Sequence, residues 1–266
     1  MASIKLFTGI LICCFLYLTE VHSQTAPTLF VAVDFMKVKP QDLSRYLEVE
    51  QEIWKPMHEE RIRQGIIVGW YLYAVEFSGT ADEYNYVAIS LYDSPEHLEN
   101  PWNQEIPRTV HPTLPISEIV EKTNTARENV KSELFSSIAT APEIPLEIPA
   151  AYLQVNFMHV EPGKNSAYEQ LETDIWLPIH TESIESGRTA GWGLWRSLFP
   201  RGSGQKYQYL TLNTFSEFSY IFQADFSAAF KNIHPEKDFA DVSEKSREAR
   251  TIVRTELWDL IDFVIR

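Results

Sequence analysis

Two stretches of this chain carry a carboxylate, an indole and an imidazole at helical spacing. The first set is Glu50, Trp54 and His58, and the second is Glu172, Trp176 and His180. Residues at i, i+4 and i+8 share one face of a helix, where a carboxylate could orient an imidazole beside an apolar wall. The pattern predicts a general acid or base, or a ligand-orienting group, in a pocket walled by Trp54 and Trp176. The alternative is that both histidines are buried packing residues.

Aromatic residues gather just downstream of each set, where they would lie on both faces of a strand. They are Trp70, Tyr71 and Tyr73 in the first stretch, and Trp192 and Trp195, followed by Arg196, in the second. A pocket lined by such side chains suits a flat organic ligand or a sugar ring. Packing in a core or an interface is the more common use of such residues. If one pocket alone is functional, we favour the second.

Metal and thiol chemistry find little support in the sequence. Cys13 and Cys14 lie inside an N-terminal apolar run, and no pair of histidines at helical spacing appears. His111 and His234 each precede a proline, which favours a role in a turn. We therefore predict no metal site.

The chemistry-bearing sets recur because the chain contains two copies of one unit. A shift of 122 positions aligns Val33–Leu72 with Val155–Leu194 and gives 18 identities in 40 positions. After one residue of slippage the match resumes, so that Tyr84 meets Tyr207 and Glu133 meets Glu256. Three prolines between the copies predict a stiff linker over residues 139–149. The repeats are expected at 24–138 and 150–266.

Each copy predicts the same order of elements. Residues 29–38 and 151–160 are rich in β-branched and aromatic side chains, which favours strands. A helical period follows over residues 42–64, and Pro56 and Pro178 are expected to bend or restart the helix of each copy. Strands are expected at 66–77 and 84–92, and at 189–199 and 207–215, joined by hairpins. The last segments, 128–134 and 248–263, read as the end of a second helical region or as a fourth strand.

The N-terminus and the net charge predict location and exclude one class of partner. Lys5 precedes an apolar run, Leu6–Leu18, that is shorter than the roughly 20 residues needed to span a bilayer. We expect residues 1–23 to be a signal peptide and the protein to be secreted or periplasmic, with no membrane span; a lipid anchor through Cys13 or Cys14 is a weaker alternative. The formal charge of −14 argues against nucleic acid.

The order of elements and the Glu50-x3-Trp54-x-Pro56-x-His58 pattern resemble the dimeric α/β-barrel superfamily. Antibiotic-biosynthesis monooxygenase-like, EthD-like and NIPSNAP-like domains and the haem-binding chlorite dismutases belong to it. The resemblance implies an α+β fold in which two tandem ferredoxin-like domains form an intrachain dimeric α/β barrel. It also implies a haem alternative, with His180 as the axial ligand, to the expectation that the protein needs no cofactor.

Two hypotheses for function follow. The first is a protein that binds, and without a cofactor transforms, a small apolar or aromatic molecule in a pocket lined by His and Trp. Its catalytic candidates are His58, His180, Glu50 and Glu172, and its ligand-binding candidates are Trp54, Trp176, Trp70, Trp192, Trp195 and Arg196. The second is a non-enzymatic scaffold that binds a glycan or a protein. In both, the two repeats pair within the chain.

Overall fold

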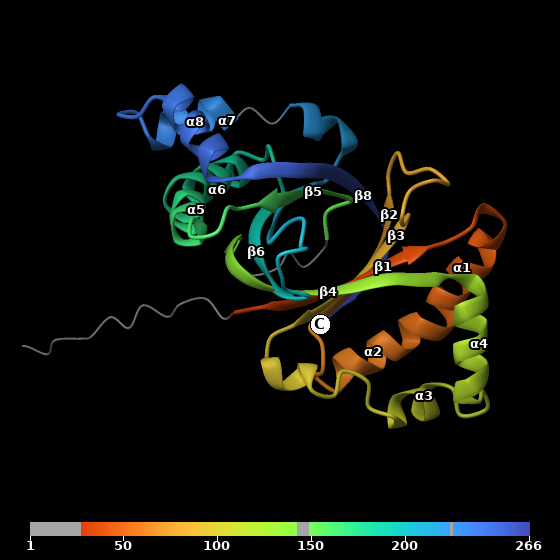
Figure 1. Ribbon diagram of the computed structural model, residues 1–266. Helices are drawn as coiled ribbons and strands as arrows, with labels where there is room; N and C mark the ends of the chain where they lie inside the picture. Colours follow the sequence, from red (N-terminus) through yellow and green to blue (C-terminus); the bar gives the residue numbers. More distant parts are fainter. Residues whose placement is uncertain (1–27, 143–148, 224–225) are drawn as a thin grey trace, which may run out of the picture.

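Eight strands drawn from both repeats close into one barrel in the computed structural model, which describes residues 28–142, 149–223 and 226–266 (Figure 1). The strands are β1 (Phe30–Lys37), β2 (Gly69–Val75), β3 (Tyr86–Tyr92), β4 (Glu128–Ala141), β5 (Tyr152–His159), β6 (Gly191–Phe199), β7 (Tyr209–Phe215) and β8 (Thr251–Ile265). Their order around the barrel is β1-β3-β2-β8-β5-β7-β6-β4, and β4 pairs with β1. Closure leaves none of these strands at a free edge.

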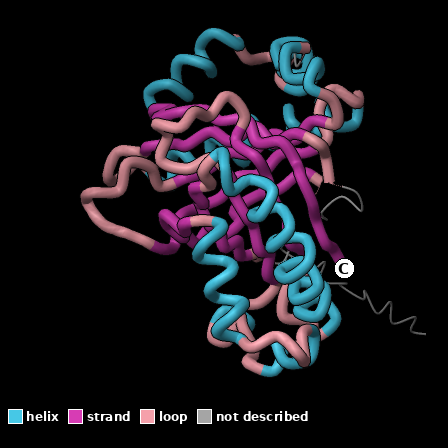
Figure 2. The backbone as a smooth tube through the Cα atoms, turned by 90° about the vertical axis from the view of Figure 1, so that its right-hand side faces the viewer, coloured by secondary structure: helices cyan, strands magenta, loops and turns pink. Residues whose placement is uncertain are grey.

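Helices cover the outside of the barrel in two groups, one from each repeat (Figures 1 and 2). The first group is α1 (Leu43–Val49), η2 (Glu50–Trp54), α2 (Lys55–Arg63), α3 (Glu105–Val110) and α4 (Ile116–Ala126). The second is α5 (Asn165–Leu171), η4 (Glu172–Trp176), α6 (Leu177–Glu185), α7 (Phe226–Ile233) and α8 (Phe239–Ala249). Short 3-10 turns lie at η1 (Pro40–Asp42), η3 (Pro95–Leu98) and η5 (Phe218–Phe222). Each repeat thus runs strand, helix, hairpin, helix, strand, which is a ferredoxin-like unit.

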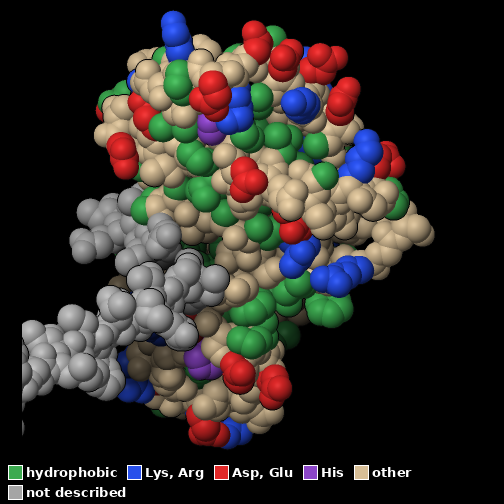
Figure 3. Space-filling model, turned by 90° about the vertical axis from the view of Figure 1, so that its left-hand side faces the viewer, with side chains coloured by type: hydrophobic (Ala, Val, Ile, Leu, Met, Phe, Trp, Pro, Cys, Tyr) green, Lys and Arg blue, Asp and Glu red, His purple; other side chains and the backbone are tan. Residues whose placement is uncertain are grey.

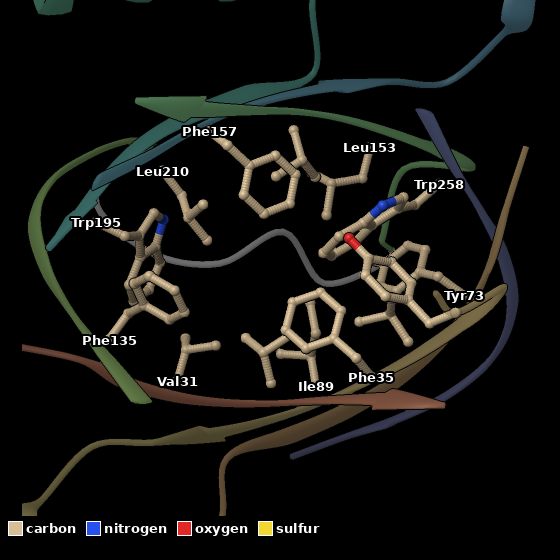
Figure 4. Packing of buried hydrophobic residues seen from close by; sticks show 14 of the residues in the cluster. Val31, Phe35, Tyr73, Ile89, Phe135, Leu153, Phe157, Trp195, Leu210 and Trp258 are labelled. Carbon is tan, nitrogen blue, oxygen red and sulfur yellow. The ribbon is translucent and has the colours of Figure 1, made fainter. Parts of the chain in front are cut away.

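Alternation along the strands divides the apolar side chains between two sides of the barrel wall. Val31 and Phe35 of β1 point inward and share one core cluster with inward side chains of β5 such as Leu153 and Phe157 (Figure 4). Outward side chains pack instead against the helices. The barrel interior therefore holds a core shared by both repeats, distinct from the layers under the helices.

The repeats join through two strand ladders and a reciprocal pair of side-chain contacts. β2 pairs with β8, and β4 pairs with β6. Inside the barrel the Tyr84 hydroxyl donates to Glu256 at 2.8 Å, and the Tyr207 hydroxyl donates to Glu133 at 2.7 Å. Each tyrosine belongs to one repeat and each acceptor to the other. The two contacts are equivalent under the internal repeat.

A π-helical turn interrupts the long helix of each repeat. These turns, η2 and η4, end two residues before Pro56 and Pro178. Proline cannot donate a hydrogen bond to the carbonyl four residues earlier, and the wider π turn accommodates that loss. The helix restarts directly after the turn, as the prolines predict.

The boundaries predicted from the sequence need correction around the linker. β4 continues through Ala141, so that residues 139–141 of the predicted linker are strand. Residues 143–148 and the predicted signal peptide, 1–23, lie outside the described residues. The sequence is compatible with helix or strand for segments 128–134 and 248–263. In the structure they belong mainly to strands β4 and β8. Among the described helices, none combines the length and apolar character needed to cross a membrane.

Candidate functional site

The predicted histidines lie in aromatic layers between a helix and the outer face of the barrel. His58 stacks on Trp70 of β2 with ring centroids 4.6 Å apart, and His180 stacks on Trp192 of β6 at 4.8 Å. Both histidines are buried. Burial lowers the pKa of His58 well below its ordinary value, with a further contribution from the Arg61 charge, and lowers that of His180 to about 3. Both imidazoles are neutral at neutral pH.

The first layer contains a buried guanidinium that the second layer lacks. Arg61 is fully buried, and its Nη1 donates to His58 Nδ1 at 3.0 Å while its Nη2 donates to the Tyr92 hydroxyl at 2.8 Å. The guanidinium also lies over the Trp102 ring at 4.0 Å, a cation–π contact. The equivalent residues of the second repeat are Ser183 and Phe215. His58 and His180 therefore sit in different electrostatic surroundings.

The predicted glutamates lie eight residues, or about two turns, before the histidines, and their hydrogen-bonding and charge partners are other residues. Glu50 accepts a hydrogen bond from Arg127 Nε at 3.1 Å. Glu172 is buried and feels the charge of Arg250. Burial outweighs the neighbouring arginine in each case and raises the pKa of both carboxyls to about 7.

The helix tryptophans hold the second helix of each repeat in place. Trp54 Nε1 donates to the Thr123 hydroxyl, and Trp176 Nε1 donates to the Ser246 hydroxyl, both at 3.0 Å. These contacts join η2 to α4 and η4 to α8. They satisfy the indole N–H groups inside the protein, so that the two tryptophans act here as packing and anchoring residues.

Two other histidines, His111 and His234, contact backbone carbonyls of the π-helical turns. His111 Nε2 lies 3.0 Å from the Ile53 carbonyl oxygen, and His234 Nε2 lies 3.2 Å from the Ile175 carbonyl oxygen. A carbonyl can only accept, so Nε2 carries the proton in both residues. These side chains supply a donor at the point where the helical hydrogen-bond pattern is interrupted.

A cavity lies on the other side of the barrel wall, in the interior. This axial cavity has a volume of about 190 Å³. Its apolar lining includes Leu29, Val31, Ile89, Leu91, Leu153 and Leu212. Tyr71, Tyr73 and Trp195 supply its aromatic surfaces, and Tyr73 and Trp195 point inward from opposite sides of the barrel (Figure 4). Of the predicted ligand-binding residues, Trp192 and Trp195 border this cavity.

Two polar atoms at the axial cavity have no hydrogen-bond partner. They are the Nε1 of Trp195 and the Oγ1 of Thr214, and both are buried. Leaving a buried donor or acceptor unpaired costs roughly 1–3 kcal/mol, which is why such atoms are uncommon in native proteins. Neither atom has accessible surface, so both lie behind the wall of the cavity.

Glycines on β6 make room for these polar side chains. A Cβ added at Gly193 would meet Trp195 Nε1 at 2.6 Å, and one added at Gly191 would meet Thr214 Oγ1 at 2.9 Å. Both contacts are closer than side chains tolerate. The glycines therefore allow the indole and the hydroxyl to lie against the β6 backbone at the cavity wall.

The other predicted residues lie away from the axial cavity. Trp70 is buried under His58, and the half-exposed Arg196 donates from Nη1 to Glu169 at 3.0 Å on the outer surface. Sequence reasoning did not select Thr214, Gly191 or Gly193. The signal that could have found them is the alternation on β6 and β7, which places residues two apart on the same face.

No protein-family model matches the chain, and no curated protein matches it. Solved structures do. A provisionally assigned monooxygenase from Fusobacterium nucleatum aligns with a TM-score of 0.56 at 11% identity, covering 91% of this chain and 95% of that one. A second such protein, from Lactobacillus acidophilus, gives 0.52 at 9% identity, with 90% and 96% covered. A heme-binding protein from Thermus thermophilus gives 0.51 at 10% identity, with 89% and 94% covered.

The chain has the dimeric α/β-barrel fold. Both ferredoxin-like halves of this dimeric α/β barrel belong to one polypeptide. The structural alignments establish the fold, and at identities near 10% they carry no argument about the chemistry.

The resemblance implies haem as an alternative cofactor, with His180 as the axial ligand. The surroundings of His180 do not fit a haem. One face of the imidazole stacks on Trp192, and the Phe226 ring packs against it at 4.9 Å. The Nδ1 atom is buried without the hydrogen-bond partner that normally orients an iron-binding histidine. Two aromatic rings therefore pack directly against the imidazole that an iron would have to approach.

The described residues form neither a metal-ion site nor, on the face drawn in Figure 3, a basic surface for nucleic acid. No three His, Asp or Glu side chains converge there to hold a metal ion. On the face drawn in Figure 3, Lys and Arg side chains are scattered among acidic and uncharged ones and form no continuous stripe. That distribution is unlike the basic surface with which proteins neutralise phosphates.

Proposed function

We propose that this protein is a secreted binding protein for a small apolar molecule, which it holds in the axial cavity. The observation that carries the proposal is the apolar cavity of about 190 Å³ at one end of the barrel, lined by aliphatic and aromatic side chains of both repeats. A dry cavity of about 150 Å³ is known to suffice for benzene, so that about 190 Å³ suits one or two rings. The N-terminal apolar run, Leu6–Leu18, supports secretion.

Binding, rather than acid–base catalysis, is the role that the lining supports. Tyr71 and Tyr73 are the titratable groups among the described residues at the axial cavity. Burial raises the pKa of Tyr71 to about 12 and that of Tyr73 further, so both phenols stay protonated at neutral pH. The buried His58 and His180 lie on the opposite side of the wall. A general base with a pKa near the working pH is therefore not part of this lining.

Isothermal titration calorimetry with tetralin, an uncharged two-ring hydrocarbon, tests the proposal. The variant Leu212→Phe adds volume inside the axial cavity and is expected to lower the affinity at least about tenfold, because the added ring takes up space that the ligand needs. Val253→Phe, on the exposed side of β8, is the matched control and should bind as the unchanged protein does. Equal affinities in all three proteins, or no binding to any, would contradict the proposal.

A second pair of variants separates the axial cavity from the histidine layers. His58→Ala and His180→Ala remove one ring from each imidazole–indole stack and should lower the melting temperature. The affinity for tetralin should stay unchanged, because neither histidine lines the cavity. Loss of binding without loss of stability would favour the predicted His pockets. Glycan binding through exposed aromatics, the scaffold hypothesis, would instead leave tetralin unbound.

A further inference from the structure

Two hairpins of the barrel each hold a phenylalanine out in solvent. The first hairpin (residues 76–83) leads from β2 to β3, and the second hairpin (residues 198–206) leads from the last residues of β6 to β7. Phe77 is 85% exposed, and Phe199, which the shift of 122 positions aligns with it, is 66% exposed. Neither ring belongs to a described core cluster or lines the axial cavity. A single exposed apolar ring is ordinary, but its recurrence at both hairpins points to a partner that covers the two.

Both hairpins lie at the same end of the barrel. Every strand is antiparallel to its two neighbours. Because β2 and β6 are four places apart in the order of eight strands, they run in the same direction on opposite sides of the barrel. Their hairpins therefore face each other across one end. Residues at the starts of the strands, such as Leu29 and Gly191, line the axial cavity, which lies toward the other end.

The two hairpins carry opposite charge. The acidic residues of the first hairpin are Glu76, Asp82 and Glu83, and the basic residues of the second hairpin are Arg201 and Lys206. The first hairpin contains no basic residue, and the second contains no acidic one. Within the described residues, none of these five side chains has an ion-pair partner. Lys37 donates to backbone carbonyls of the first hairpin and offsets one of its three charges, which leaves it acidic.

The surface beside each hairpin is hollowed. The hollow at the first hairpin has a volume of about 370 Å³, and Val75, Ile221 and Leu257 supply apolar side chains to it. The hollow at the second hairpin has a volume of about 480 Å³, and Pro200 and Tyr209 border it. A phenylalanine ring of a second copy fits into either. Rotating that copy by 180° about an axis perpendicular to the barrel sets each first hairpin over the other copy's second hairpin, so that the contact closes as a two-fold dimer.

We infer that two copies of this chain associate end to end through these hairpins, with the acidic hairpin of each copy against the basic hairpin of the other. Phe77 and Phe199 are covered in that contact. The formal charge of −14 on each chain opposes association at long range. At physiological ionic strength, however, charges farther apart than about 8 Å are screened, so that the opposite charges in contact decide the outcome. The inference is independent of the ligand in the axial cavity.

Sedimentation velocity at physiological ionic strength tests the inference, and the unchanged protein should sediment as a dimer. Phe77→Ser and Phe199→Ser should each weaken the dimer at least about tenfold, because each removes a ring that association buries. Val120→Ser is the control, since Val120 is 50% exposed on α4, away from both hairpins. It should leave the dimer unchanged. A monomeric unchanged protein would overturn the inference, as would a monomer that binds phospholipid vesicles through the two rings.

Reversing the charge of one hairpin at a time tests which hairpins meet. Glu76→Lys with Glu83→Lys gives a protein with two basic hairpins, and Arg201→Glu with Lys206→Glu gives one with two acidic hairpins. Each protein alone should be monomeric, with an unchanged melting temperature, and an equimolar mixture of the two should form a heterodimer. Dimers that survive in either protein alone, or a mixture that stays monomeric, would overturn the proposed pairing.

Discussion

At the scale of single residues, the internal repeat presents the same imidazole–indole stack in two settings. Arg61 and Tyr92 surround His58 with hydrogen-bonding groups, whereas Ser183 and Phe215 leave Nδ1 of His180 unpaired. The stack persists in both. Because the imidazole–indole stack is the same in both environments, we attribute it to packing. The stack does not depend on a particular proton-transfer partner.

Buried carboxyls predict a pH dependence of stability. The folded pKa of Glu172 is about 7, above its unfolded value of 4.5, so the folded state holds a proton that the unfolded state releases between these values. This group therefore favours folding at pH 5 and loses that contribution as the pH rises through about 7. Glu172→Gln should remove about 1–3 kcal/mol of this pH dependence.

Urea denaturation of both proteins at pH 5 and pH 8 measures the effect. His180, with a folded pKa of about 3, acts in the opposite sense between about 3 and 6.5, but it is present in both proteins and cancels in the difference. The unchanged protein should lose more stability than the variant on going from pH 5 to pH 8. Identical losses would show that Glu172 ionises as freely in the folded protein as in the unfolded chain.

At the scale of elements, the strands and the first helix of each repeat follow from the sequence, because alternation and helical periodicity are local signals. Pro56 and Pro178 also predicted the restart of the helix. The axial cavity did not follow. It depends on which strands of different repeats face each other. It also depends on Gly193, because a side chain there would clash with Trp195. Such long-range complementarity has no local pattern.

The contact between η4 and α8 gives a prediction at this scale. Trp176→Phe and Ser246→Ala each remove one partner of the same hydrogen bond. Each single variant should lose stability, and the double variant should lose less than the sum, with a coupling of about 1 kcal/mol. Chemical denaturation of the four proteins measures it. Additive losses would mean that the indole and the hydroxyl do not interact.

At the scale of the whole molecule, neither repeat has a complete barrel. An isolated half would expose the edges of β2 and β4, which pair with β8 and β6 in the full chain, together with its inward apolar face. We expect the halves 24–137 and 148–266 to dimerise or aggregate, and the chain from residue 24 to remain one closed barrel. Sedimentation velocity on the three proteins decides this. Two stable monomeric halves would contradict it.

The reciprocal bonds Tyr84–Glu256 and Tyr207–Glu133 have a consequence for how such a chain can change. In a symmetric pair of identical subunits, one substitution at such a position alters two contacts at once. Joining the subunits in one polypeptide frees each contact to vary by itself, and the neighbouring residue is already Lys131 in one repeat and Arg254 in the other. The same independence lets one wall of the interior acquire a glycine while its counterpart keeps a tyrosine. Fusion thereby converts a two-fold chamber into one whose two walls differ.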